Sequence, residues 1–120
     1  IPTGTVIGDR FFTSSISGID ATTGRPGDGP EKQFALAFHN LEVLMRRIEG
    51  SLDNVGLLTA FVKNHEQREF LEATWKQVFP NPGDCPARKV TVVDLPEAVF
   101  VQIQAFGVLG KKRKNIKNYL

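Results

Sequence analysis

Apolar residues along this chain change their spacing several times, and each spacing predicts a different element. Two short apolar runs at 5–7 and 10–13 flank Gly8-Asp9, a pair suited to a tight turn. Together they predict a β-hairpin. Residues 18–29 are rich in glycine, which is typical of a loop.

A helix is predicted to begin at Pro30, because Asp28 and Glu31 have the spacing of a capping box and proline fits a first helical turn. Apolar residues then recur three and four positions apart, which predicts one buried helix face. These residues are Phe34, Ala37, Phe38, Leu41, Leu44, Met45 and Ile48. Gly50 is expected to end the helix.

Residues 55–63 are apolar on both faces, which predicts a strand near the centre of a sheet. The two expected rows are Val55, Leu57 and Phe61 on one face and Leu58, Ala60 and Val62 on the other. A second helix is predicted from a cap of Asn64 and Gln67 to Pro80. Its apolar face holds Phe70, Leu71, Thr74, Trp75 and Val78.

Two further strands, Arg88–Val93 and Ala98–Phe106, follow a turn at 81–84. The linker at 94–97 is short, so these strands are expected to be antiparallel neighbours. The resulting order is β-β-α-β-α-β-β. Two helices cover only one face of such a sheet, so the other face is expected to be buried between subunits.

Alternation in the last predicted strand places Gln102 and Gln104 in one row with two phenylalanines. Two amides in an apolar row either meet a ligand or form hydrogen bonds across a subunit interface. Spacing alone favours the interface.

The size and charge of the chain indicate one domain with a basic end. Its 120 residues are 41% hydrophobic and 23% charged, ordinary values for a globular domain. Five of the 15 basic residues lie in 111–117, so the net charge of +2 less these five leaves residues 1–107 at −3. The prediction is a domain at 1–110 and a basic tail at 111–120. Such a tail can attract nucleic acid, but a solvated end is the favoured interpretation.

Composition excludes several classes of protein and site. No apolar run approaches the roughly 18 residues that span a bilayer. His39, His65 and Cys85 are scattered, so no metal site is expected. A single cysteine forms no internal disulfide and fits a reducing compartment. We therefore expect a cytoplasmic location, with a mitochondrial one left open.

Three segments carry candidate chemistry. Ser14 and Ser15 precede the glycine-rich loop, where hydroxyls and free amides either bind a carboxylate or phosphate or serve simple turn formation. Arg88 opens a strand and offers a permanently charged donor fork for a carboxylate; its alternative is a surface ion pair. Cys85 is either a reactive thiol or, as we favour, a small apolar filler.

Taken together, these segments resemble the YjgF/RidA family, the reactive-intermediate enamine/imine deaminases, over almost the whole chain. The run from Gly8 to Ser15 resembles the family's early strand, which ends in Thr-Ser-Gly. The other matching positions are Asp20, Thr23-Gly24, Gln33, Asn40-Leu41, Phe61-Val62-Lys63-Asn64, Pro86-Ala87-Arg88 and Leu95-Pro96. Pro-Ala-Arg followed by Leu-Pro is the most specific part.

The resemblance implies an α+β, chorismate-mutase-like fold. It also implies a homotrimer with a central barrel of sheets, helices outside, and three sites in the clefts between subunits. No metal or organic cofactor is required.

The resemblance also implies roles for particular residues. Arg88 would hold the carboxylate of a 2-imino acid or its enamine tautomer. Ser14 and the backbone of Ser15 would line the same pocket, and the carbonyl of Val90 would face the substrate nitrogen. Water would then add to the C=N carbon and ammonia would leave, which gives a 2-keto acid.

Four positions depart from the family pattern. The glycine after the family's Thr-Ser pair is Ser15 here. The last-strand glutamate that positions water corresponds to Gln102, which holds water but cannot accept its proton. A pocket asparagine of the second helix corresponds to Glu72, and a capping tyrosine falls at about Ile1. The predicted function is an imine deaminase. The alternatives are a member that binds small carboxylates without catalysis and, less favoured, one of the ribonuclease or translation-inhibitor type.

Overall fold

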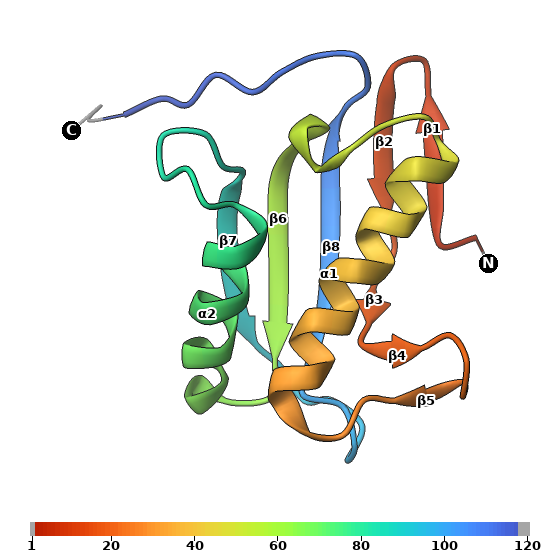
Figure 1. Cartoon of the computed structure of the whole chain (residues 1–120), viewed down its shortest axis with the longest axis vertical. Coiled ribbons are helices and arrows are strands. Elements are labelled where there is room, and N and C mark those ends of the chain that lie inside the picture. Colours follow the sequence, from red (N-terminus) through yellow and green to blue (C-terminus); the bar gives the residue numbers. More distant parts are fainter. Residues whose placement is uncertain (1, 118–120) are drawn as a thin grey trace.

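Two helices cover one face of a mixed sheet in the computed structural model, which describes residues 2–117 (Figure 1). The helices are α1, Gly29–Arg47, and α2, Arg68–Val78. In spatial order the main strands are β1 (Gly4–Ile7), β2 (Arg10–Thr13), β8 (Val101–Val108), β6 (Val55–Val62) and β7 (Ala87–Val92). The smaller elements are β3 (Ile16–Ser17), β4 (Ile19–Asp20), β5 (Arg25–Pro26), η1 (Leu52–Asn54) and η2 (His65–Gln67). The α+β architecture and the predicted hairpin of β1 and β2 are confirmed.

The prediction that the last two strands are neighbours is wrong. β6 lies between them: it pairs in parallel with β7 and antiparallel with β8. The linker crosses the end of β6, where Lys63 donates to the carbonyls of Pro96 and Glu97. A strand that is apolar on both faces takes the central place, and the shorter, more polar β7 is left at the edge.

The segment at 18–29 is more ordered than a loop. β4 and β5 pair in antiparallel fashion within it, and β3, just before it, pairs with β8. These strands are two residues long, too short for a periodic signal. Asn40 on α1 fixes them by donating from Nδ2 to the carbonyls of Ser17 and Ile19, at 3.0 and 2.9 Å.

A β-bulge changes the expected rows of β6. The register shifts between Val55 and Leu57, so Val55 lies on the buried face with Leu58. Leu57 lies on the opposite face and is 40% exposed. From Leu58 to Val62 the side chains of β6 alternate between the two faces as predicted.

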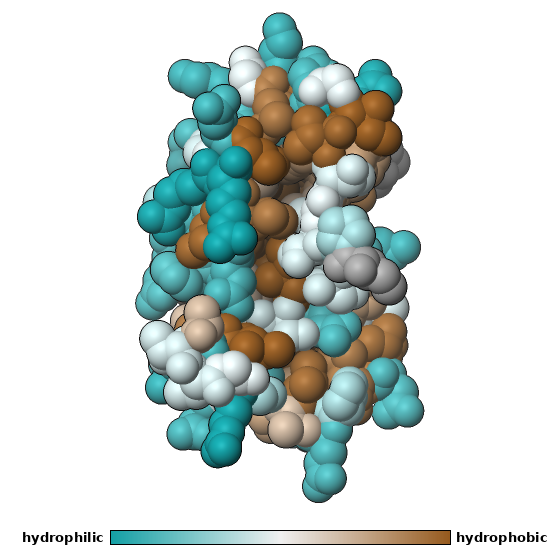
Figure 2. All heavy atoms as spheres, turned by 90° about the vertical axis from the view of Figure 1, so that its right-hand side faces the viewer, coloured by the Kyte–Doolittle hydropathy of each residue, from teal (hydrophilic) through white to brown (hydrophobic). Residues whose placement is uncertain are grey.

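The sheet face away from the helices has no covering layer within residues 2–117. Register places side chains of β6 and β8 on it, including Leu57, Phe61, Gln102, Gln104 and Phe106. At the β1 edge, Val6 and Ile7 are exposed, and hydrophobic side chains reach the surface along this side of the molecule (Figure 2). The helix-covered face instead holds the core, which includes Phe34, Phe38, Leu41, Leu58 and Ile103.

α1 begins where it was predicted, but its caps differ from the prediction. Asp28 is the N-cap, but its side chain makes no capping hydrogen bond. The helix ends before Gly50, at Arg47, and the residue with left-handed backbone geometry is Glu49, with a φ of 61°. Gly50 follows it and donates its N–H to the carbonyl of Met45 at 2.8 Å. This is a Schellman arrangement with glutamate at the position that favours glycine.

Glu49→Gly should therefore stabilise the protein by about 1 kcal/mol, because glycine adopts a positive φ without a Cβ clash. Glu49→Ala is the control, since it removes the same charge but keeps the Cβ. Urea unfolding should show a higher midpoint for the glycine variant alone. Equal midpoints for the two variants would show that the backbone conformation is not the cause.

The first part of the basic tail is packed on the domain, contrary to the favoured solvated end. The side chain of Arg113 is buried and donates to the carbonyls of Leu52 and Val55 at 2.6 and 3.0 Å and to Asp84 Oδ1 at 3.1 Å. Asn115 bonds both backbone groups of Cys85. The tail thus holds the segment that leads into β7.

Candidate functional site

Arg88, the second residue of β7, lies on the helix-covered side of the sheet. Its register partner Leu58 is in the core, and paired residues share a face. The guanidinium lies 5.0 Å from the centre of the Trp75 ring and donates from Nη2 to Oε1 of Glu72. Arg88 is one-quarter exposed and Glu72 is half exposed, so both remain accessible to a ligand.

Prolines and a turn connect α2 to the start of β7. Pro80 follows α2, and the Asp84 N–H donates to the carbonyl of Asn81 at 3.0 Å, which closes the predicted turn. Cys85 is half-buried beside the tail, which agrees with its interpretation as a filler. Val90, two residues after Arg88, packs its side chain against the core.

The predicted serines and glutamine form a second group at the junction of β2, β3 and β8. Ser14 donates its N–H and its hydroxyl to the carbonyl of Thr3, at 2.8 and 3.1 Å. Ser15 accepts a hydrogen bond from Gln104 Nε2 at 3.3 Å. Gln102 pairs in register with Ser17 of β3.

The two groups do not meet within one chain. Phe61 of β6 pairs with Gln102 on one side and with Thr91 on the other, so Gln102 shares the face of Thr91. Arg88 is three residues before Thr91 and therefore lies on the opposite face. Arg88, Glu72 and Val90 form one group, while Ser14, Ser15 and Gln102 form the other.

Sequence reasoning placed Trp75 in the core and did not foresee its contact with Arg88. Trp75 is only partly buried, and its ring is tilted against that of Phe79 with 4.7 Å between the ring centres. The guanidinium lies over the face of the Trp75 ring. The available signal was the position of Trp75 one helical turn after Leu71 on the apolar face of α2, next to the strand that Arg88 opens. Gln104 was singled out from its row, but its bond to Ser15 was not foreseen.

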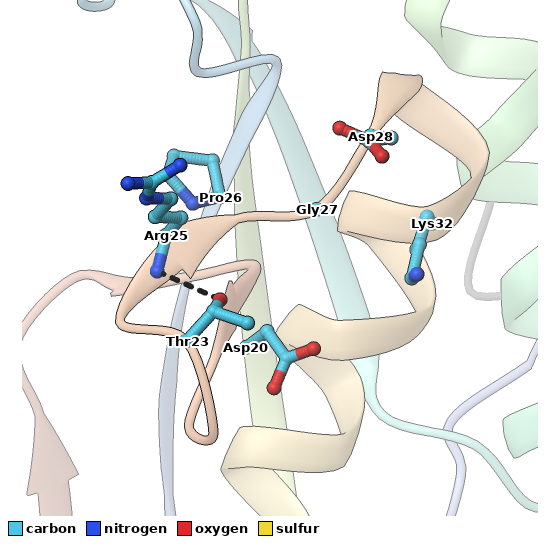
Figure 3. A pocket seen from close by; sticks show the side chains of 7 residues that line it. All are labelled: Asp20, Thr23, Arg25, Pro26, Gly27, Asp28 and Lys32. Atoms are coloured by element: carbon cyan, nitrogen blue, oxygen red, sulfur yellow. Dashed lines mark hydrogen bonds between the residues drawn. The ribbon is translucent and has the colours of Figure 1, made fainter.

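A separate polar hollow of about 440 Å³ lies beside the start of α1 (Figure 3). Its lining includes Asp20, Thr23, Arg25 and Lys32, and none of the predicted site residues. Hydrogen bonds from the hydroxyl and N–H of Thr22 lower the pKa of the Asp20 carboxyl below its ordinary value. Asp20 thus serves the local turn.

Other predicted features are placed as follows. His39 and His65 are exposed. Within residues 2–117, no three His, Cys, Asp or Glu side chains are grouped to hold a metal ion. Neither helix described there is long and apolar enough to cross a membrane. Ile1, where the capping tyrosine was expected, lies outside the described residues, as do 118–120 of the tail.

Comparison with known proteins covers nearly all of the chain. The family model described as endoribonuclease L-PSP matches residues 3–109. The RutC family protein UK114 of Drosophila melanogaster is 31% identical over 109 residues, 88% of this chain and 77% of that protein. The structure of RidA from the Antarctic bacterium Psychrobacter sp. is 21% identical, with a TM-score of 0.83, over 89% of this chain and 86% of that one. Escherichia coli TdcF, solved with bound serine, is 23% identical, with a TM-score of 0.81, over 88% and 85%.

Proposed function

This chain belongs to the endoribonuclease L-PSP family, which includes the YjgF/RidA proteins, and from that premise we propose that it hydrolyses 2-imino acids to 2-keto acids and ammonia. The proposal rests on the position of Arg88 at the start of an edge strand. Its guanidinium packs over the Trp75 ring and stays accessible to a ligand. Among residues 2–117 its one hydrogen bond goes to Glu72. Donors remain for a planar ligand group.

The reaction needs little from the protein besides binding and orientation. Arg88 holds the substrate carboxylate, which fixes the neighbouring C2 atom and its C=N bond. Water adds its oxygen to C2 of the protonated imine, and one of its protons moves to the nitrogen. The C–N bond then breaks as the C2 carbonyl forms, and the remaining hydroxyl proton passes to the departing ammonia. The products are a C2 ketone and ammonium, so atoms and charge balance without a cofactor. We assign the carbonyl of Val90 to the substrate nitrogen, as the family resemblance implies.

Gln102 is proposed to hold the attacking water. Its amide donates and accepts hydrogen bonds but does not take a proton, so acceleration comes from positioning. Ser14 and the backbone of Ser15 line the same cleft on this proposal. Because Gln102 lies on the sheet face opposite Arg88, the complete site requires two copies of the chain.

The open sheet face supports that assembly. It carries Leu57 and Phe106, each 40% exposed, and Phe12 lies 4.9 Å from Phe106 between ring centres. Apolar area of this kind is covered when subunits associate. We propose a homotrimer in which the sheets face one another, with three equivalent clefts, acting in the cytoplasm.

The test measures keto acid formation from 2-iminopropanoate that an amino-acid oxidase generates in the assay. The protein should accelerate hydrolysis above the rate of free imine decay, and Gln102→Glu should increase that acceleration because it supplies a proton acceptor. No acceleration by the wild-type protein would refute the deaminase assignment.

A second candidate is a member that binds small carboxylates without turning them over. It is favoured by Gln102 in place of a carboxylate and by the pairing of Arg88 with Glu72. Calorimetry with 2-keto acids distinguishes the two candidates, since binding without acceleration selects the second. An RNA-acting role is less supported, because Arg113 of the basic tail is engaged within the domain.

A further inference from the structure

Glu72 pairs with the Arg88 guanidinium, the group that the proposed function assigns to the substrate carboxylate. It reaches Arg88 from the middle of α2, and its side chain is half exposed. Arg68 and Lys76 lie four residues before and after it, one helical turn away, yet the ion pair of Glu72 within residues 2–117 is with Arg88. The charge of Glu72 is therefore directed at the proposed anchor.

A ligand whose only charge is negative is expected to have a reduced affinity for the Arg88–Glu72 pair. The carboxylate of a 2-keto acid on Arg88 would lie beside the carboxylate of Glu72. Like charges at such spacing repel, and packing of the guanidinium on Trp75 reduces screening by water. The ligand must also loosen the existing bond from Arg88 Nη2 to Glu72.

A zwitterionic ligand meets a different balance. A 2-amino acid or a protonated 2-imino acid carries a positive nitrogen on the carbon next to its carboxylate. With the carboxylate on Arg88, an ammonium or iminium nitrogen has hydrogen atoms for Glu72 as well as for the carbonyl of Val90, and each charge then has an opposite partner. We infer that Glu72 makes the Arg88 site selective for zwitterionic 2-imino and 2-amino acids over 2-keto acids.

This selectivity suits the direction of the proposed reaction. The protonated imine carries the positive charge and its 2-keto acid product does not, so Glu72 favours binding of the substrate and release of the product. Gln102 is neutral, so the negative charge among the side chains that we assign to the cleft comes from the Glu72 carboxylate. The inference rests on the proposed function, because it needs Arg88 as the carboxylate anchor.

The experiment compares pyruvate with L-alanine, which share a three-carbon skeleton and differ at C2 in a ketone or an ammonium group. Calorimetry gives the dissociation constants for the wild type, Glu72→Gln and the control Glu69→Gln. Glu69 lies on the same helix, is exposed, and has no ion pair with Arg88 among the residues described. The preference for alanine over pyruvate should fall at least about tenfold in Glu72→Gln and stay within about twofold in Glu69→Gln.

Arg88→Gln separates this inference from the proposed function. If it abolishes binding of both ligands while Glu72→Gln leaves their ratio unchanged, the selectivity of Glu72 is refuted and the anchor stands. If Arg88→Gln leaves binding intact, or if the wild type binds neither ligand, both assignments are refuted. A ratio that falls equally in Glu69→Gln would show a general charge effect and would also overturn the role of Glu72.

Discussion

Arg88→Ala is expected to reduce imine hydrolysis by at least about 100-fold, to the level of free imine decay. The variant removes the two charge-assisted hydrogen bonds that a carboxylate can make to one guanidinium fork. It also leaves Glu72 as an uncompensated negative charge beside the incoming carboxylate. Both changes weaken binding of the substrate and of the transition state.

The matched control for this prediction is Arg47→Ala. Arg47 is exposed in the last turn of α1, so the variant removes the same side chain and charge outside the groups assigned to the site. Its rate should stay within about twofold of the wild type, and both variants should keep the wild-type oligomeric state. Arg88→Lys should recover only a small part of the activity, because an ammonium lacks the planar fork. Full activity in Arg88→Ala would remove Arg88 from the mechanism.

Gly107→Ala is expected to have the largest effect on stability, about 3 kcal/mol of the free energy of unfolding. A Cβ at Gly107 would lie 2.0 Å from the carbonyl oxygen of Asn54 and 2.8 Å from Cζ of Phe11. The first contact is with the backbone of Asn54, at the end of η1 just before the bulge of β6, and backbone cannot move aside as a flexible side chain could. The bulge and the close approach of the two strands therefore require glycine here.

Gly56→Ala tests the same bulge from its other strand. A Cβ there meets only the carbonyl oxygen of Phe106, at an ordinary 3.7 Å. Chemical unfolding should show a small change for this variant and a large loss for Gly107→Ala. Similar values for the two variants would show that the close approach at Gly107 is relieved at little cost.

Local patterns predicted the main elements because each element was long enough to show its period. The heptad-like spacing from Phe34 to Met45 specified α1, and alternation in β8 separated buried Ile103 from Gln102 and Gln104. The order of the strands was another matter. Loop length suggested that β7 and β8 were neighbours. In the structure β6 lies between them, because a strand that is apolar on both faces is best buried at the centre of the sheet.

The bulge in β6 and the cap of α1 show a second limit. Gly56 was the one sequence signal for the bulge, and a lone glycine in a strand does not fix which residue changes face. Asp28 and Glu31 have capping-box spacing, but the Asp28 side chain makes no capping hydrogen bond. Such details depend on backbone angles that residue type alone does not determine.

The sequence singled out candidate residues, whose roles stay a proposal, but it did not predict their arrangement. Arg88 stood out because it opens a strand. Its partner Glu72 lies sixteen residues earlier in the chain, and the two meet only because α2 packs over β7. The separation of Arg88 from Gln102 follows from strand register, which the sequence pattern left open. Among the residues of the resemblance, Gln33 and Asn40 have structural roles. Gln33, for example, bonds the carbonyl of Ala98 at 2.7 Å and the N–H of Phe100 at 2.9 Å.

The most direct test of the central claim is a crystal structure of the protein with pyruvate. The proposed function predicts the ligand's carboxylate on the guanidinium of Arg88, in a cleft between two copies of the chain. It further predicts that Gln102 of the neighbouring copy faces the C2 atom of the ligand. Pyruvate bound away from Arg88, or a cleft that does not contain Gln102, would contradict the account.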